Sequence, residues 1–187
     1  MLATQPRITN ASRLLALCDK DQYRFIRVVN KTCNITNGHV LIRRFVNLPD
    51  GFYQAGLHDS VIPVSPHITS FEDAYPDIEA FKPPFETLKA HCQINAETMG
   101  HMKQVCDESP DDIVYMDANG LQHEEGVYRY PFNFPHPVKL NAKYLGIALV
   151  ELSQYPVVTV LKDFSGYRSP LIMGVNWGSC VMIAPIG

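Results

Sequence analysis

The 187-residue sequence contains no apolar run near the ~18 residues that a membrane-spanning helix needs. Its first ten residues, MLATQPRITN, lack the apolar core of a signal peptide, so we expect a soluble, cytoplasmic protein. Charged residues make up only 19% of the chain and the net charge is −3. This balance excludes a basic tail that holds nucleic acid unaided, but it allows a local basic face.

The signatures of common enzyme classes are also missing. There is no glycine-rich phosphate loop, no H-E-x-x-H and no G-x-S-x-G. The seven histidines show no ligand spacing and the five cysteines form no C-x-x-C pair, so we expect no metal, no cofactor and five free thiols. One acidic group is interpreted as part of a solvated connector, with a cation site or an acid/base pair as the alternative: Glu72, Asp73, Asp77 and Glu79. The sequence favours a protein that is not an enzyme.

The residues that are present predict a short helix over 10–18, capped by Asn10, and three short strands after it. The strands are expected at 23–29, 32–36 and 40–46, with the turn Asn37-Gly38 between the last two. The proline-rich stretch 48–84 is interpreted as an irregular connector with strands near 60–64 and 86–93.

The same order of elements is expected twice more. Helices are predicted over 95–106 and 140–152, capped by Asn95 and Asn141. Strands are predicted at 112–117, 157–162, 169–173 and 180–183, with a loop or broken strand from the Asn119-Gly120 turn to Phe134. A helix followed by antiparallel strands, used three times, indicates an α+β fold with antiparallel sheets.

Three segments resemble one family, the bacterial DNA polymerase III beta-subunit sliding clamps. Residues 32–41, TCNITNGHVL, are similar to the family's "ATDGHRL" hairpin, and residues 75–83, YPDIEAFKP, to its "FPDY…P" connector. At the C-terminus, LNAKYLGIALVEL resembles the "N-x-x-YLLDAL" helix, VTVLKDFSGYRSPLIM the strand pair that follows it, and VMIAPIG the ending "VVMPMR".

The resemblance is collinear and implies a DNA-clamp-like fold that corresponds to the middle and last of three clamp domains. We expect a truncated clamp-like domain with its connector over 1–84 and a C-terminal clamp-like domain over 85–187. The chain between Val46 and Tyr75 is too short for a complete middle domain, and the first clamp domain has no counterpart.

In the family, a pocket between these two domains receives a short, mostly apolar peptide from polymerases and repair proteins. The resemblance implies that the matching positions form it here: Thr36, Gly38, His39, Leu41, Pro170, Met182, Ile183, Pro185 and Ile186. The alternative is that Leu41, Met182 and Ile183 are ordinary core residues and His39 lies on a turn.

Clamps encircle duplex DNA with helices facing the hole, so the resemblance also implies DNA-facing cations at Arg13, Lys103, Lys139 and Lys143. Ordinary solvated charges are the alternative. The expected function is that of a bacterial or phage processivity factor, a homo-oligomeric ring of about three chains that tethers a polymerase or another partner to DNA. A non-encircling adaptor or decoy, and an enzyme that uses the acidic connector, are the other hypotheses.

Overall fold

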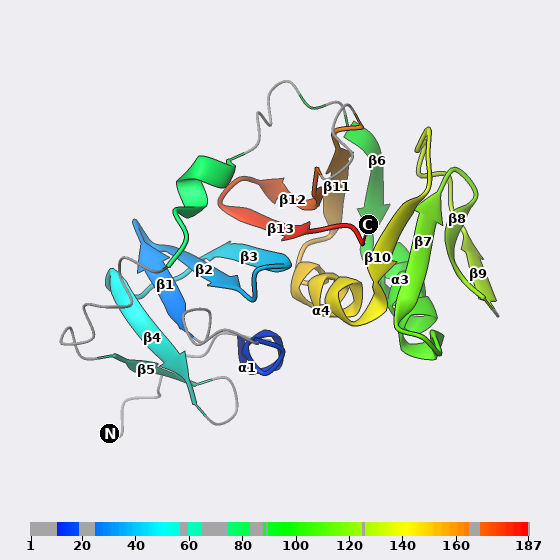
Figure 1. Cartoon of the computed structure of the whole chain (residues 1–187). Helices are drawn as coiled ribbons and strands as arrows, with labels where there is room; N and C mark the ends of the chain where they lie inside the picture. The colour runs from blue at the N-terminus through cyan, green and yellow to red at the C-terminus, as the bar shows by residue number, and fades with distance from the viewer. Residues whose placement is uncertain are drawn as a thin grey trace. The chain divides into compact units, whose positions relative to one another are not determined.

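The computed structural model describes residues 11–18, 25–56, 60–64, 75–82, 88, 90–124, 126–164 and 169–186. The chain divides into two compact units, Met1–Pro83 and Pro84–Gly187, coloured blue to green and green to red in Figure 1. None of the helices among the described residues is long and apolar enough to cross a membrane.

The first unit contains one helix followed by an antiparallel sheet. Its elements are α1 (Ala11–Leu15), β1 (Ile26–Val29), β2 (Thr32–Thr36), β3 (Val40–Phe45), β4 (Gly51–Ala55), β5 (Val61–Pro63) and the 3-10 helix η3 (Ile78–Phe81). Within this unit the strand order is β5-β4-β1-β2-β3. Asn30 and Lys31, which join β1 to β2, both have positive φ (51° and 58°), as a two-residue primed hairpin turn requires.

The second unit contains two copies of a strand–helix–three-strand pattern. The first copy is β6 (Ala90–Asn95), α3 (Ala96–Glu108), β7 (Ile113–Asp117), β8 (Gly120–His123) and β9 (Gly126–Arg129). The second is β10 (Val138–Asn141), α4 (Ala142–Leu152), β11 (Val157–Lys162), β12 (Leu171–Asn176) and β13 (Ser179–Ile183). Figure 1 shows α3 and α4 close to the strands of both copies.

The two copies exchange their first strands. β6 pairs with β11, which extends the β11-β12-β13 meander, and β10 pairs with β7, which extends β7-β8-β9. The strand pairings described within each unit are antiparallel. The expected α+β class and the helix-then-strands plan are confirmed, with α1, α3 and α4 each followed along the chain by at least three strands.

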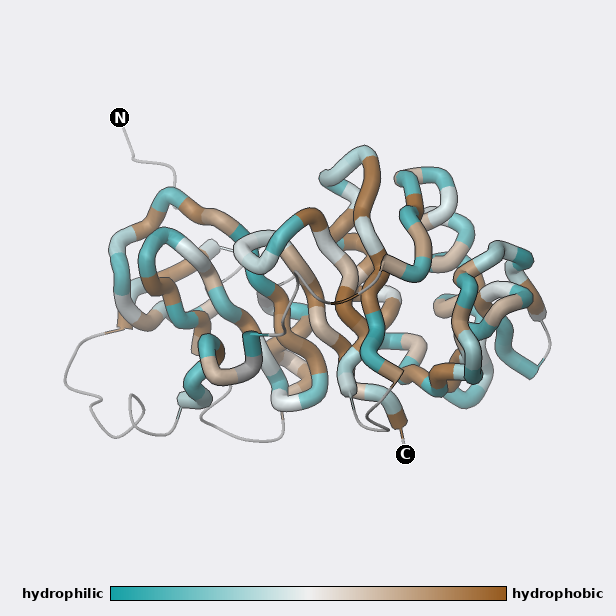
Figure 2. Tube along the Cα trace, turned by 90° about the horizontal axis from the view of Figure 1, so that it is seen from above, coloured by the Kyte–Doolittle hydropathy of each residue, from teal (hydrophilic) through white to brown (hydrophobic). Residues whose placement is uncertain are grey.

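Alternation of buried and exposed residues fixes which face of each strand meets the core. Val138 and Leu140 of β10, and Val114 and Met116 of β7, are buried, while Lys139 and Tyr115 between them are not. In Figure 2 the tube correspondingly changes between hydrophobic brown and hydrophilic teal along its strands. The buried faces of the second unit pack on helices that themselves meet closely, since Gly146 of α4 lies against Lys103 and Cys106 of α3.

Asparagine caps begin both helices of this unit, as the sequence predicts. Asn95 Oδ1 accepts a hydrogen bond from the Thr98 amide at 2.8 Å, and Asn141 Oδ1 accepts one from the Tyr144 amide at 3.1 Å.

The contribution of the Asn95 cap to the free energy of unfolding can be measured by substitution. We expect Asn95→Ala to lower the free energy of unfolding by about 1 kcal/mol, because the Thr98 amide loses its acceptor. Asn95→Asp is the matched control and should keep the stability, since a carboxylate accepts the same bond. Urea titration followed by circular dichroism measures both, and equal losses in the two variants would contradict the capping role.

Several strands differ from the sequence prediction. β4 lies in the stretch predicted to be irregular, and β8 and β9 lie where a loop or broken strand is predicted. β10 is absent from the prediction, because its four residues run directly into the cap of α4. The predicted β2 is confirmed to the residue.

A row of aromatic rings is also not predicted from the sequence. Tyr128, Tyr130, Phe132 and Phe134 follow one another at alternate positions, with neighbouring ring centroids 5.1–6.4 Å apart. The Tyr130 hydroxyl donates to the Gln93 carbonyl at 2.7 Å, which joins this segment to β6. The period of two is the signal that identifies an extended segment here.

Candidate partner-binding surface

The hairpin between β2 and β3 is held by side chains of its own turn. Thr36 Oγ1 donates to the Val40 carbonyl at 2.7 Å and accepts from the Gly38 amide at 3.1 Å. Asn37 Oδ1 accepts from the amides of His39 and Val40 at 3.0 and 2.9 Å. Gly38 has φ of 91°, which favours glycine. These hydrogen bonds and the positive φ of Gly38 therefore restrict the turn to few conformations.

This turn exposes only part of the predicted pocket set. Gly38 and His39 are exposed, whereas Thr36 and Leu41 are buried. Leu41 is 8% exposed and pairs with Thr36 across the hairpin.

The second unit carries the other predicted pocket residues on β13 and beside it. Met182 and Ile183 are buried and pair with Ile172 and Leu171 of β12. Pro170, Pro185 and Ile186 are half-buried, so they form the accessible part of this set.

The C-terminal segment after β13 is tied to β10. The Ile186 amide donates to the Lys139 carbonyl at 2.9 Å. One predicted pocket residue and one predicted DNA-facing residue thus lie side by side within the second unit.

The four predicted DNA-facing cations occupy different settings. Arg13 is exposed on α1, and Lys139 lies on a strand, on the face opposite the buried Val138 and Leu140. Lys103 forms an ion pair with Asp107 one helical turn later.

The helices of the second unit are more acidic than basic. Lys143 pairs with Asp112 at 2.5 Å, so both helical lysines have a carboxylate partner. Together α3 and α4 contain two lysines and four carboxylates. Phosphate contact at these helices would have to replace ion pairs that already exist.

The connector 75–82 lies on the sheet of the first unit. The Tyr75 hydroxyl donates to the Asn34 carbonyl at 3.0 Å, and its ring meets Phe52 edge-on at 5.7 Å. The Arg27 guanidinium lies 5.8 Å from both ring centroids. Tyr75 and Ile78 are buried, so this segment is part of the core of the first unit.

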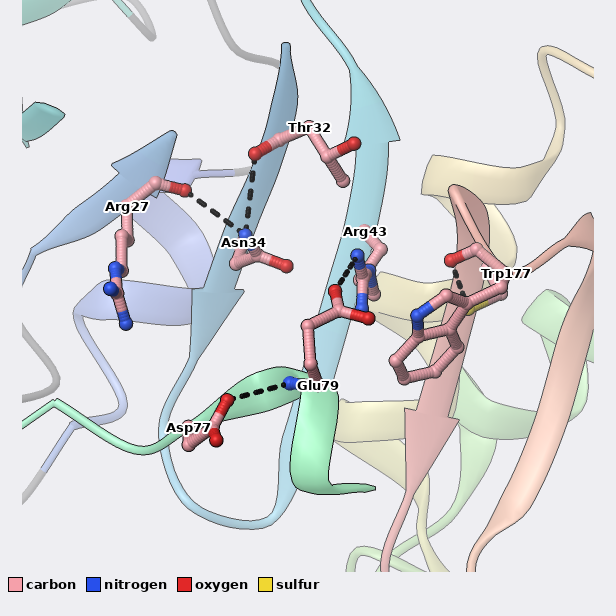
Figure 3. A network of polar contacts seen from close by, with 8 residues as sticks. Arg27, Thr32, Asn34, Arg43, Asp77, Glu79 and Trp177 are labelled. Atoms are coloured by element: carbon pink, nitrogen blue, oxygen red, sulfur yellow. Dashed lines mark hydrogen bonds and ion pairs between the residues drawn. The ribbon is translucent and has the colours of Figure 1, made fainter. Parts of the chain in front are cut away.

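The acidic residues of this connector have structural partners. Figure 3 shows Glu79 directed at Arg43, and Glu79 Oε1 accepts from Arg43 Nη2 at 2.7 Å. Asp77 caps η3, with its Oδ1 accepting from the Glu79 amide at 3.1 Å. Glu72 and Asp73 lie outside the described residues. The described part of the chain holds no group of three His, Cys, Asp or Glu side chains that suits a metal ion.

The thiols of Cys92 and Cys106 are held in their protonated form. Burial raises the pKa of Cys92 to about 11 and the pKa of Cys106 to about 12. All five cysteines are free. Since the thiolate is the nucleophile, neither Cys92 nor Cys106 is activated at neutral pH.

In sequence, the chain matches no protein-family model, and no curated protein is significantly similar. Solved structures are similar over nearly the whole chain. The Helicobacter pylori beta clamp bound to a DNA ligase peptide covers 95% of this chain with a TM-score of 0.59 and 10% identity. DNA polymerase III subunit beta from Borrelia burgdorferi, in complex with a natural product, covers 99% with a TM-score of 0.60 and 11% identity.

The chain has the fold of a bacterial sliding clamp. The sliding clamp from Pseudomonas aeruginosa bound to griselimycin covers 100% of the chain with a TM-score of 0.51 and 12% identity. This chain spans 62% and 63% of the length of the Helicobacter and Borrelia clamps. The resemblance found in the sequence motifs is confirmed at the level of the fold.

Proposed function

We propose that this chain is a reduced sliding-clamp-like protein that tethers a DNA polymerase or a repair protein to duplex DNA in the cytoplasm. The observation that supports this most is the clamp fold itself, which extends over 95–99% of the chain in the Helicobacter and Borrelia comparisons. The protein would act as a scaffold without a catalytic step, in keeping with the buried, protonated Cys92 and Cys106 thiols and the structural roles of Asp77 and Glu79.

The partner would bind through a short apolar peptide. On the first unit, the exposed Gly38 and His39 of the hairpin are proposed for contact with a partner. On the second unit, the accessible residues proposed for the peptide are Pro170, Pro185 and Ile186. Such a set suits an extended peptide, with backbone contacts for affinity and apolar contacts for specificity. The Helicobacter pylori clamp is described with a DNA ligase peptide bound, which makes that peptide a suitable first probe.

A non-encircling adaptor or decoy is the second candidate function. It is favoured by the ion pairs of Lys103 and Lys143 and by the excess of carboxylates on α3 and α4. A ring gains its hold on DNA from phosphates that cations neutralise, and these helices offer little free positive charge. An adaptor would keep the peptide-binding surface and need no DNA contact.

The oligomeric mass of the protein and its retention on circular and linear DNA distinguish the ring from the adaptor. If the chain forms a ring, light scattering will give a defined oligomer across a hundredfold range of concentration. The protein will then remain on nicked circular plasmid in a gel-filtration column and dissociate after the plasmid is linearised. A monomer at every concentration, or equal retention on both DNA forms, would contradict the ring and favour the adaptor.

A further inference from the structure

A row of side chains crosses the outer face of the sheet formed by β10, β7 and β8. Lys139 is opposite Tyr115 in the β10–β7 pairing, and Tyr115 is opposite Gln122 in the β7–β8 pairing. Residues directly opposite in antiparallel strands share a face. Lys139 and Gln122 are half-buried and Tyr115 is 37% exposed, so the row is open to a ligand.

This row begins beside the C-terminal segment. The Ile186 amide bonds to the carbonyl of Lys139 itself, at 2.9 Å. A peptide that contacts Pro185 and Ile186 therefore lies within reach of the four-carbon stem and ammonium of Lys139.

Lys139 differs from the lysines of the two helices in its charge environment. Lys103 and Lys143 each hold a carboxylate, whereas Lys139 forms no ion pair with any residue that the structure describes. The nearest carboxylate on the same face of β7 is Asp117, which already accepts from the Asn119 amide and from Gln122 Nε2 at 2.7 and 3.1 Å.

The residues proposed for peptide contact contain no lysine, arginine or carboxylate. An apolar surface with a cation at its edge is complementary to an apolar peptide with an anionic neighbour. Arg129 of β9 is exposed on the same outer face, but β9 is the strand farthest from β10, so Lys139 is the described cation of this face that lies beside the C-terminal segment.

We infer that the ammonium of Lys139 binds a carboxylate in the partner peptide. The preferred peptide motif then has an acidic residue directly flanking its apolar core. The Tyr115 hydroxyl beside it is a second donor for the same carboxylate. This inference rests on the proposed peptide binding, and it gives Lys139 a role different from the DNA contact that the sequence resemblance implies.

The test uses the full chain and fluorescein-labelled peptides with the apolar core Leu-Val-Leu-Phe, flanked on one side or the other by Glu or by Gln. Anisotropy in 50 mM NaCl should show about threefold tighter binding of the Glu peptide at one of the two flanking positions, as expected for an exposed ion pair. In 1 M NaCl the preference should vanish, because the Debye length falls to about 3 Å.

Substitutions separate the role of Lys139 from a general effect of charge. We expect Lys139→Gln to bind the Glu and Gln peptides equally and to bind the Gln peptide as the wild type does. Lys139→Arg should keep the preference for Glu. Lys143→Gln, which changes the net charge by the same amount, should also keep it.

The outcomes are distinct. Equal binding of Glu and Gln peptides to the wild type, or a preference that survives in Lys139→Gln, overturns the inference and leaves the proposed function intact. Loss of DNA retention in Lys139→Gln with the peptide preference unchanged also overturns it, in favour of phosphate contact. Absence of binding by all of the peptides and by the ligase peptide overturns the proposed function and the inference with it.

Discussion

Gly120→Ala is expected to cost about 3 kcal/mol of unfolding free energy or more. Gly120 begins β8 with φ of 141°, and a Cβ there would lie 1.9 Å from the Tyr128 carbonyl oxygen of β9 and 2.9 Å from the Arg129 Cα. Both obstacles are backbone atoms of a paired strand, so they cannot move aside as a flexible side chain does. Strained φ and forced overpacking each cost about 1–3 kcal/mol.

A second glycine provides the matched control. Gly100 lies exposed in α3, and a Cβ there would meet nothing within 4 Å. Gly100→Ala should therefore raise the stability by about 1 kcal/mol, since alanine favours the helix and restricts the unfolded chain. Urea titration of both variants gives the two free energies. A Gly120→Ala protein as stable as the wild type would show that β8 and β9 are not paired as described.

Alkaline pH is expected to destabilise the protein through the buried thiol of Cys106 and the half-buried thiol of Cys92. Burial raises the pKa of Cys92 to about 11 and of Cys106 to about 12, while an unperturbed thiol has a pKa of 9.0. Between pH 9 and pH 11 the unfolded chain therefore releases protons that the folded chain retains. The contribution of these thiols to the free energy of unfolding is fully present below pH 9 and is lost above it. The loss is about 1.4 kcal/mol per pH unit for Cys106 and smaller for the half-buried Cys92, whose charge solvent screens.

The slope against pH, rather than the stability at one pH, is the quantity to compare. Cys106→Ala should lower the slope between pH 9 and pH 11 by about 1.4 kcal/mol per unit, whatever its baseline stability. Burial lowers the pKa of Lys162, which opposes the thiols below pH 10.5 but acts equally in the wild type and the variant. Urea titrations at half-unit steps of pH measure both slopes, and identical slopes would show that Cys106 is accessible in the folded state.

The elements with strong local signals are those that the sequence predicts best. Asn95 and Asn141 mark the starts of α3 and α4 because their side chains have a specific backbone partner. β2 is identified by its β-branched residues and the Asn37-Gly38 turn. Such signals depend on residues close in sequence, so they need no knowledge of the tertiary structure.

The missed strands lack such signals. β8 has the sequence GLQH and β10 the sequence VKLN, and four residues are too few for a period of two to be distinguished from a loop. β10 is stabilised by its pairing with β7, which no local pattern of residues 138–141 indicates.

The site is less predictable than the fold. Motif resemblance identifies Ile186 and Lys139 and assigns them to different functions. The hydrogen bond that joins them links two segments far apart in sequence, so their proximity follows only from the tertiary structure. For the same reason, the sequence identifies Glu79 as one of several connector carboxylates and does not indicate that Arg43 is its partner.

Peptide binding is the central claim, because the ring and the adaptor both require it. The most direct measurement is the fluorescence anisotropy of the labelled DNA ligase peptide, titrated with wild type, with Ile186→Asp and with Val157→Asp as an exposed-valine control. The account predicts saturable binding by the wild type and Val157→Asp, and at least tenfold weaker binding by Ile186→Asp, which equals about 1.4 kcal/mol. Absence of binding to the wild type, or equal affinity in Ile186→Asp, would contradict it.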